Sequence, residues 1–118
     1  MNTIPFQTIN WAVVEKVAYA GESGTAYWQT LQYDRLRIRL VEYSKEYLAD
    51  HWCEKGHIVY CLEGDFVSEL QTKEPTQLSA GMMYVVSDDL SSHRSASKNG
   101  AKLLIIDGAF LNAMHSTP

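Results

Sequence analysis

The segment from Arg35 to Tyr43, with the sequence RLRIRLVEY, constrains the fold of this chain more than any other. Successive side chains of a β-strand point to opposite faces, so its alternation of apolar and basic residues predicts a strand with one buried and one exposed face. The apolar face, expected to be buried, consists of Leu36, Ile38 and Leu40. The basic face, expected to be exposed rather than to bind an anionic ligand, consists of Arg35, Arg37 and Arg39.

Short strands are predicted along most of the remaining chain. Further segments rich in aliphatic, aromatic or β-branched residues are 25–32, 58–62, 66–70, 82–86 and 101–106. Turn signals separate them, as at Tyr33-Asp34, Gly64-Asp65 and Lys73-Glu74-Pro75. The segment from Asn10 to Val17 is compatible with either a short helix or a strand. About eight to ten short strands with turns between them predict an all-β sandwich or barrel.

Length and charge argue against several classes of protein. The 118 residues correspond to one domain, expected to span residues 1–118 with its core at about 25–107. Ten lysines and arginines against fourteen aspartates and glutamates give a net charge of −4, unlike a nucleic-acid binder or a polybasic membrane anchor. No apolar run is long enough to span a bilayer, and the N-terminus lacks the features of a signal peptide. We therefore expect a cytoplasmic protein with neither nucleic-acid nor membrane partners.

The segment Asp50 to His57, DHWCEKGH, concentrates potential metal ligands in a chain with only two cysteines and four histidines. On a strand, His51 and Cys53 would point to the same side. The residues 54–56, which end in glycine, match a three-residue hairpin loop that would place His57 opposite Cys53, at a Cβ separation of about 4.5–5.5 Å. A thiolate and two imidazoles suit zinc or iron. The spacing alone is equally compatible with a metal site and with histidine and cysteine residues that have no common function.

The second cysteine is predicted to lie in the core. In the hairpin register, Cys61 lies roughly 13 Å from Cys53 along the strand, which is too far for a disulfide. The remaining histidine, His115, lies near the C-terminus and is expected to be solvated.

These residues resemble the two motifs of the cupin superfamily. The pattern His51-x-Cys53-x3-His57-x6-Gly64 is similar to the first motif, G-x5-H-x-H-x3,4-E-x6-G, and the stretch YCLEGD at 60–65 is similar to its closing strand and turn. The segment from Gly81 to Ser97 resembles the second motif, with His93 one residue beyond the usual histidine position. More narrowly, the DHWC run resembles a small family of "DHCW motif" cupin-fold proteins.

The resemblance implies an all-β, single-domain cupin, that is, a double-stranded β-helix or jelly-roll barrel. It also implies four metal ligands, which are His51, Cys53, His57 and His93. Cys53 stands where the family has its second histidine, and His57 where it has a glutamate. Lys45, Ser87, Asp89 and Ser97 also depart from the motifs. With these ligands zinc or iron is the expected metal, and nickel and manganese are the alternatives.

Two classes of function are compatible with such a site. One is a metal-dependent dioxygenase, isomerase or lyase that acts on a small polar molecule in the barrel mouth. The other is a non-catalytic small-molecule or metal sensor with a closed zinc site. Glu42, Tyr43 and Tyr84 are nearby candidates for a general base but are expected to be structural. The resemblance further implies a homodimer that pairs through sheet edges, since an edge strand needs covering.

Overall fold

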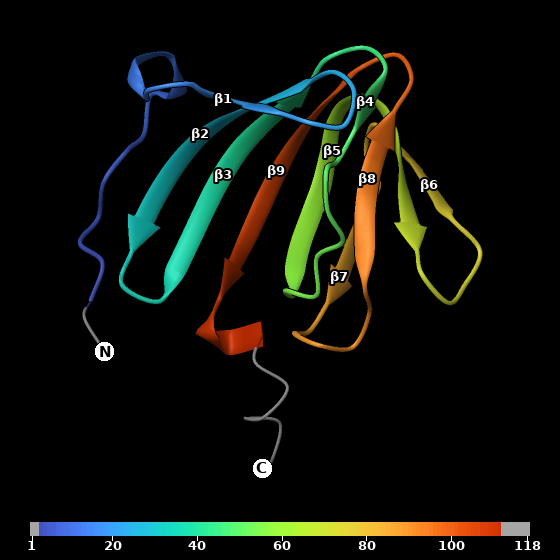
Figure 1. Cartoon of the computed structure of the whole chain (residues 1–118). Coiled ribbons are helices and arrows are strands. Elements are labelled where there is room, and N and C mark those ends of the chain that lie inside the picture. The colour runs from blue at the N-terminus through green and yellow to red at the C-terminus, as the bar shows by residue number, and fades with distance from the viewer. Residues whose placement is uncertain (1–2, 112–118) are drawn as a thin grey trace.

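The computed structural model describes residues 3–111, which form antiparallel β-strands and two short 3-10 turns (Figure 1). The predicted all-β class is therefore confirmed. The strands are β1 (Val17–Ala20), β2 (Thr25–Tyr33), β3 (Leu36–Tyr43), β4 (Tyr47–Leu48), β5 (His57–Leu70), β6 (Thr76–Ser79), β7 (Met83–Val86), β8 (His93–Ser97) and β9 (Ala101–Gly108). The turns are η1 (Trp11–Val13) and η2 (Ala109–Leu111). In this part of the chain no helix is long and apolar enough to cross a membrane. His115 lies outside the described residues.

The sheet follows the order β1-β2-β3-β9-β5-β8-β4, with β6 and β7 also pairing with β5. It curls into a half-barrel, so that β2, β3 and β9 form one wall and β4, β8 and β6 the other (Figure 1). Strand β5 belongs to both walls. Its first half pairs with β9 and β7, and its second half pairs with β6 and β8.

Strand β5 passes between the walls at a bend centred on Gly64. The ladder with β9 shifts register between Cys61 and Glu63, and Gly64 has a φ of +74°, a conformation that glycine adopts without strain. A Cβ atom on Gly64 would also collide with the carbonyl oxygen of Gly100. The sequence pattern predicted a chain reversal at Gly64-Asp65, which is wrong. The glycine instead kinks one continuous strand, and the chain reverses only at 71–75.

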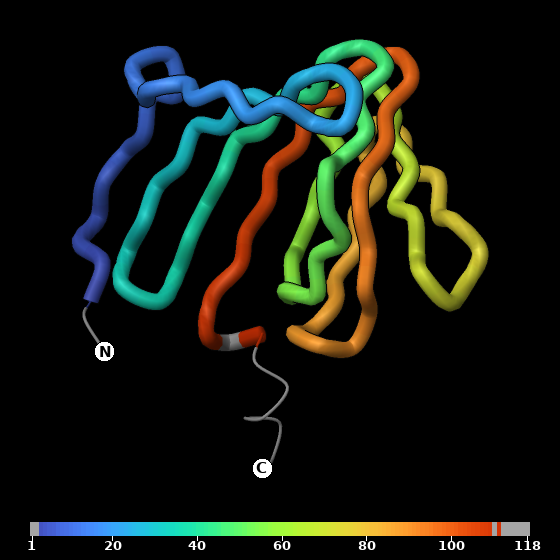
Figure 2. The backbone as a smooth tube through the Cα atoms, viewed as in Figure 1, coloured from blue at the N-terminus to red at the C-terminus, as the bar shows by residue number. Residues whose placement is uncertain are grey.

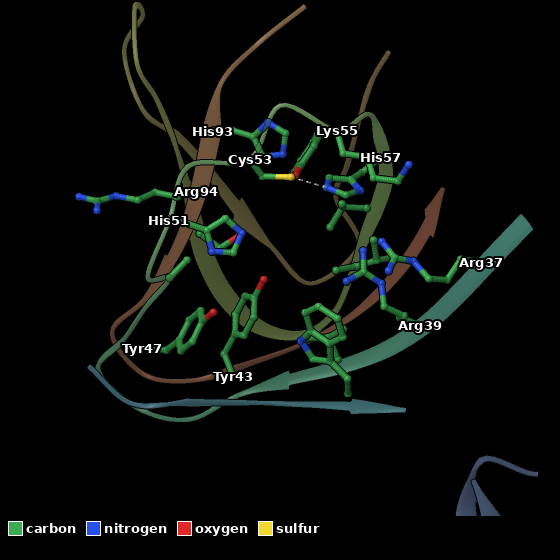
Figure 3. Close-up of a pocket in the computed structure, with 17 residues that line it drawn as sticks. Arg37, Arg39, Tyr43, Tyr47, His51, Cys53, Lys55, His57, His93 and Arg94 are labelled. Atoms are coloured by element: carbon green, nitrogen blue, oxygen red, sulfur yellow. Dashed lines mark hydrogen bonds between the residues drawn. The ribbon is translucent and has the colours of Figure 1, made fainter. Parts of the chain in front are cut away.

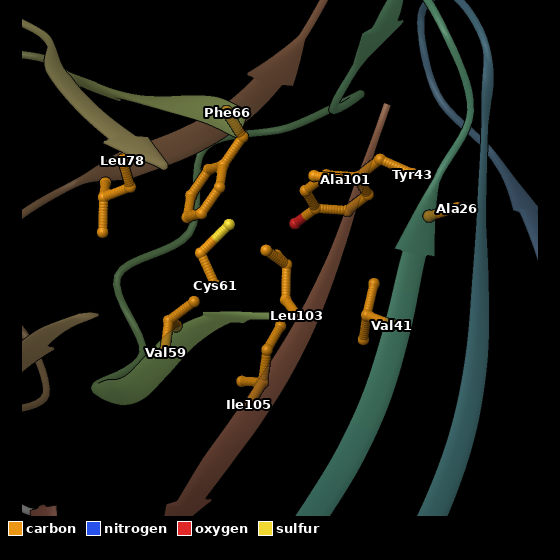
Figure 4. Close-up of a cluster of buried hydrophobic side chains, with 10 residues drawn as sticks. All are labelled: Ala26, Val41, Tyr43, Val59, Cys61, Phe66, Leu78, Ala101, Leu103 and Ile105. Atoms are coloured by element: carbon orange, nitrogen blue, oxygen red, sulfur yellow. The ribbon is translucent and has the colours of Figure 1, made fainter. Parts of the chain in front are cut away.

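The apolar core lies between the two walls (Figure 4). Phe66 and Leu78 from one wall face Val59, Cys61 and Leu103 from the other, and all five are at most 2% exposed. Cys61 is a free thiol in this core, as predicted.

The polarity predicted for β3 is wrong, because its arginines and not its leucines face the inside of the half-barrel. Arg39 is only 5% exposed, whereas Leu36, Ile38 and Leu40 lie on the outer face and are partly exposed. Arg39 shares its face with Val41 and Tyr43, which belong to the core. The charge is tolerated inside because Asp107 on β9, directly opposite Arg37, pairs with both arginines.

The bend at Gly64 yields a prediction on stability. We expect Gly64→Ala to lower the free energy of unfolding by at least about 3 kcal/mol, because the left-handed backbone costs about 1–2 kcal/mol and the new methyl group meets backbone atoms. Gly81→Ala is the matched control: its φ is +94°, but no atom lies within 4 Å of the added Cβ. It should cost only about 1–2 kcal/mol in urea denaturation. Equal losses for the two variants would contradict the close packing at the bend.

Candidate metal centre

The segment 50–56 is not the hairpin strand that the sequence predicted. Cys53 forms an isolated antiparallel bridge with His93: its N–H donates to the His93 carbonyl oxygen (2.7 Å), and the His93 N–H donates back (2.9 Å). His57 begins β5 and pairs with Val86 of β7. The predicted register, with His57 opposite Cys53, is therefore wrong, because Cys53 pairs with β8 and not with β5.

The side chains of Cys53, His57 and His93 nevertheless converge (Figure 3). One ligand atom from each lies within 4.8 Å of the others, and the Cys53 Sγ lies 3.6 Å from the His57 Nε2. His57 and His93 are buried, whereas Cys53 is half-buried. A loop, the start of β5 and the start of β8 thus supply one ligand atom each.

Hydrogen bonds fix which nitrogen of each ring faces the cluster. The His57 Nδ1–H donates to the Asp107 carboxylate (3.1 Å), and the His93 Nδ1–H donates to the Ser91 carbonyl oxygen (3.2 Å). Both oxygens can only accept, so each Nδ1 carries the hydrogen. The Nε2 atoms are left to bind a metal, in the arrangement by which oxygen acceptors orient metal-binding imidazoles.

Asp107 is the centre of this hydrogen-bond network. Its Oδ2 accepts from His57 Nδ1, from Arg37 Nη2 (3.0 Å) and from Arg39 Nη2 (2.9 Å). Burial alone would raise its pKa, but the hydrogen bonds from His57 and Arg37 hold the pKa of Asp107 well below its usual range. The carboxylate is therefore charged and orients His57.

The thiol of Cys53 is activated by its neighbours. The hydrogen bond from His57, followed by the influence of His93, lowers the pKa of Cys53 to about 5. Burial would lower the pKa of His57, but Asp107 and Cys53 outweigh it and raise that pKa. In the metal-free protein Cys53 is therefore a thiolate at neutral pH, and its Sγ lies beside the His57 ring.

The three side chains fit a divalent transition metal. Within the described part of the chain, the buried Nε2 of His93 has no hydrogen-bond partner, which is costly for a polar atom unless something binds there. A thiolate and two imidazole nitrogens are the donors that zinc and iron prefer, whereas magnesium and calcium prefer oxygen. The 3.6 Å between the Cys53 Sγ and the His57 Nε2 falls within the roughly 3.3–3.8 Å between ligand atoms around a tetrahedral zinc.

A cavity of about 220 Å³ adjoins the three ligands (Figure 3). Its walls include aromatic side chains of β2, β3 and β7, namely Trp28, Tyr43 and Tyr84. Tyr43 and Tyr84 have raised pKa values because they are buried. They are therefore neutral hydroxyl groups at physiological pH.

His51, the fourth residue proposed from the sequence, also lines this cavity, but it is not part of the three-residue cluster. Its side chain is 74% exposed, and its Nδ1 lies 2.7 Å from an Asp50 carboxylate oxygen. Since 50–52 is not a strand, His51 and Cys53 need not point the same way. His51 as a ligand stays a prediction.

Three residues of the site were not recognised from the sequence as part of it: Asp107, Arg37 and Arg39. The signal for Asp107 was present, because it has the same strand parity as the buried Ala101, Leu103 and Ile105. For the arginines, the signal was that Val41 and Tyr43, which follow on the same face of the strand, are typical core residues. A carboxylate and two arginines with core-facing parity on two strands indicate a buried ion pair.

Comparisons with known proteins agree on the fold. No protein-family model and no curated protein matches the sequence. Ectoine synthase from P. lautus superposes with a TM-score of 0.71 at 14% identity, over 87% of this chain and 78% of that one. A sugar phosphate isomerase of the cupin superfamily from Silicibacter pomeroyi gives 0.70 at 12%, over 86% and 75%. A cupin-like protein from Thermotoga maritima gives 0.69 at 14%, over 90% and 84%.

These similarities confirm the fold expected from the two sequence motifs: the chain has the cupin fold. At such low identities they are evidence for the fold alone.

The pKa of Cys53 yields a test of the site. Because that pKa is lowered from 9.0 to about 5, the metal-free protein should hold Cys53 as thiolate at all pH values above about 5. The rate of alkylation by iodoacetamide should rise through pH 5 and be level by pH 7, and one equivalent of zinc should slow it at least tenfold. Buried Cys61, whose pKa is raised, should react only on unfolding. Mass spectrometry resolves the two sites, and a rate that still climbs through pH 8–9 would contradict the lowered pKa.

Proposed function

We propose that this protein is a metal-dependent enzyme of the cupin fold, a dioxygenase, isomerase or lyase, that acts on a small polar molecule. The observation that carries the proposal is the cluster of Cys53, His57 and His93 at the wall of a cavity. Three ligands leave coordination positions for a substrate, as in catalytic metal sites. Zinc and iron are the favoured metals, with nickel and manganese as alternatives.

Each residue has a distinct role in this proposal. Cys53 supplies the negative charge that offsets the cation, and His57 and His93 supply neutral Nε2 donors. Asp107 keeps His57 in the orientation and tautomer that ligation needs. A divalent metal bound here supplies Lewis acidity, and iron adds redox chemistry. Trp28 and Tyr84 narrow the cavity and limit the water that enters with the substrate.

Metal content tests the three-residue centre. We expect wild type purified with its native metal to carry about one divalent ion per chain. Cys53→Ser and His57→Ala should each bind zinc at least tenfold more weakly, because each loses one of three ligands. Cys61→Ala is the matched control for loss of a thiol, and it should keep the ion. Unchanged stoichiometry in both ligand variants by elemental analysis would rule out this centre.

His51 decides between the enzyme and the alternative of a non-catalytic sensor with a closed zinc site. If His51 is not a ligand, His51→Ala should change zinc affinity less than threefold, and cobalt-substituted protein should show an unchanged absorption spectrum. If His51 completes a four-ligand shell, the same variant should lose affinity tenfold or more. That second result, together with a spectrum indifferent to added small anions, would overturn the enzyme proposal.

We also propose that the partner of this chain is a second copy of itself. On the outer face of the half-barrel, the cross-strand rows through Leu36, Ile38 and Leu40 consist mainly of apolar side chains. This apolar face continues onto β7. Its side chains are Leu31, Leu36, Ile38, Leu40, Ile58, Tyr60, Met83, Val85, Leu104 and Ile106. Within these rows of the described sheet no charged side chain points outward, and the one amide, Gln29, donates to the backbone of Trp11 and Val14. Two copies can therefore bury this face against each other across a two-fold axis without burying a charge. The N-terminal segment runs beside β2 (Figure 2). The Tyr33 hydroxyl donates a hydrogen bond to the Gln7 side chain.

Light scattering tests this assembly. Val85 is 65% exposed, so Val85→Glu should fold normally yet place two like charges in the interface and convert a dimer to a monomer at micromolar concentration. Leu90→Glu is the matched control, because Leu90 is 69% exposed but lies in the loop after β7. A Val85→Glu protein that stays dimeric would favour the edge pairing expected from the sequence. A monomeric wild type would contradict both interfaces.

A further inference from the structure

Basic side chains line the cavity beside the proposed metal centre. They are Arg37, Arg39, Lys55 and Arg94. Among the cavity-lining residues that the structure describes, none is an aspartate or a glutamate. The cavity therefore presents positive charge and hydrogen-bond donors to whatever enters it.

The charge of Arg94 is balanced outside the cavity. Its Nε donates to Glu69 (2.7 Å), and its Nη1 donates to Glu22 (3.3 Å). It also stacks on Trp52, with its guanidinium carbon 4.7 Å from the ring centre. We therefore assign Arg94 to the structure of the wall and not to ligand binding.

Arg37 and Arg39, in contrast, share one carboxylate. Both donate to Oδ2 of Asp107, so two cations are matched by a single negative charge. The pair retains one positive charge in excess, and Lys55 adds another at the same wall. Arg39 is the buried member of this group, and a buried charge without full compensation is unfavourable unless an anion completes it.

Arg39 carries the most direct sign of a missing partner. It is 5% exposed, and its Nε–H has no hydrogen-bond acceptor in the described structure. Its guanidinium lies over the ring of Trp28, with the carbon 4.4 Å from the ring centre, which holds the group in a fixed plane. One N–H donor of a rigid, buried guanidinium thus lacks an acceptor, and the donors of a planar guanidinium fit an oxyanion.

We propose that the cavity binds a small oxyanion, a carboxylate or phosphate group, through the guanidinium of Arg39, with Arg37 and Lys55 supplying further positive charge. The volume of about 220 Å³ holds about seven water molecules, so the ligand has on the order of ten non-hydrogen atoms. Asp107 and the His57 ring separate Arg39 from the ligand atoms of the proposed metal centre. Arg39 and the three ligand residues line the same cavity, so an anion held by Arg39 shares that cavity with the proposed metal centre. Its role as the substrate rests on the proposed function, whereas the anion site itself does not.

Nuclear magnetic resonance can observe the proposed contact directly, because the ¹⁵N–¹H signal of a buried arginine Nε is resolved. Full-length protein, both free of metal and loaded with zinc, is titrated with inorganic phosphate, with glycolate and with the neutral analogue glycolamide. We expect phosphate or glycolate to shift the Arg39 Nε signal saturably in both samples, and glycolamide to leave it unchanged. Whichever anion binds more tightly identifies the group as phosphate or carboxylate.

The variants separate charge from geometry. Arg39→Gln should weaken anion binding at least tenfold, followed through the indole signal of Trp28. If Arg39→Gln does not fold, Arg39→Lys serves in its place. It keeps the charge but loses the planar guanidinium, and it should weaken anion binding at least threefold. Arg35→Gln is the matched control. This substitution removes the same charge from the same stretch of sequence, but Arg35 does not line this cavity. Its anion affinity should equal that of wild type.

The outcomes distinguish this inference from the proposed function. Equal responses to glycolate and glycolamide, or wild-type anion affinity in a folded Arg39 variant, would overturn the anion site even if zinc binds. Anion binding in a protein that takes up no metal would uphold the site and sink the proposed metal enzyme. Loss of anion binding in Arg39→Gln, with zinc content per chain unchanged, supports both.

Discussion

The structure depends on one buried carboxylate. Asp107, on the inner face of β9, accepts hydrogen bonds from two arginines of β3 and from His57 at the start of β5. Removing a partner from a buried ion pair commonly costs about 3–5 kcal/mol, because the remaining charge is left without compensation. Asp107 therefore links three neighbouring strands and also sets the orientation of one proposed metal ligand. The same contact contributes to the fold and to the chemistry.

This arrangement divides the interior of the half-barrel into two parts. Toward Phe66 and Leu78 the inside is apolar and closely packed. Toward Asp107 it is polar, with aromatic side chains beside charged ones. The cluster of Cys53, His57 and His93 lies next to the polar part, where a cavity remains. A site that must both hold a cation and admit a polar molecule requires such an incompletely filled end.

The sequence predicted the fold class because strand alternation and turn residues are local signals, and it predicted the composition of the cluster because the cupin-like motifs hold Cys53, His57 and His93. It predicted the wrong face of β3 to be inside, because in a leucine–arginine alternation the leucines are ordinarily the buried residues. Only the contact with Asp107, nearly seventy residues away, reverses the usual preference. The pairing of Cys53 with His93 is likewise a long-range contact, and hairpin rules predict only the pairing of segments adjacent in sequence.

Strand β5 gives the two walls a common backbone. A single run of residues from His57 to Leu70 belongs to both, with its first half paired to β9 and its second half to β8. Unfolding of the whole strand would therefore remove hydrogen bonds from both walls at once. His57 is the first residue of this strand, so one proposed metal ligand is positioned by the strand that the two walls share.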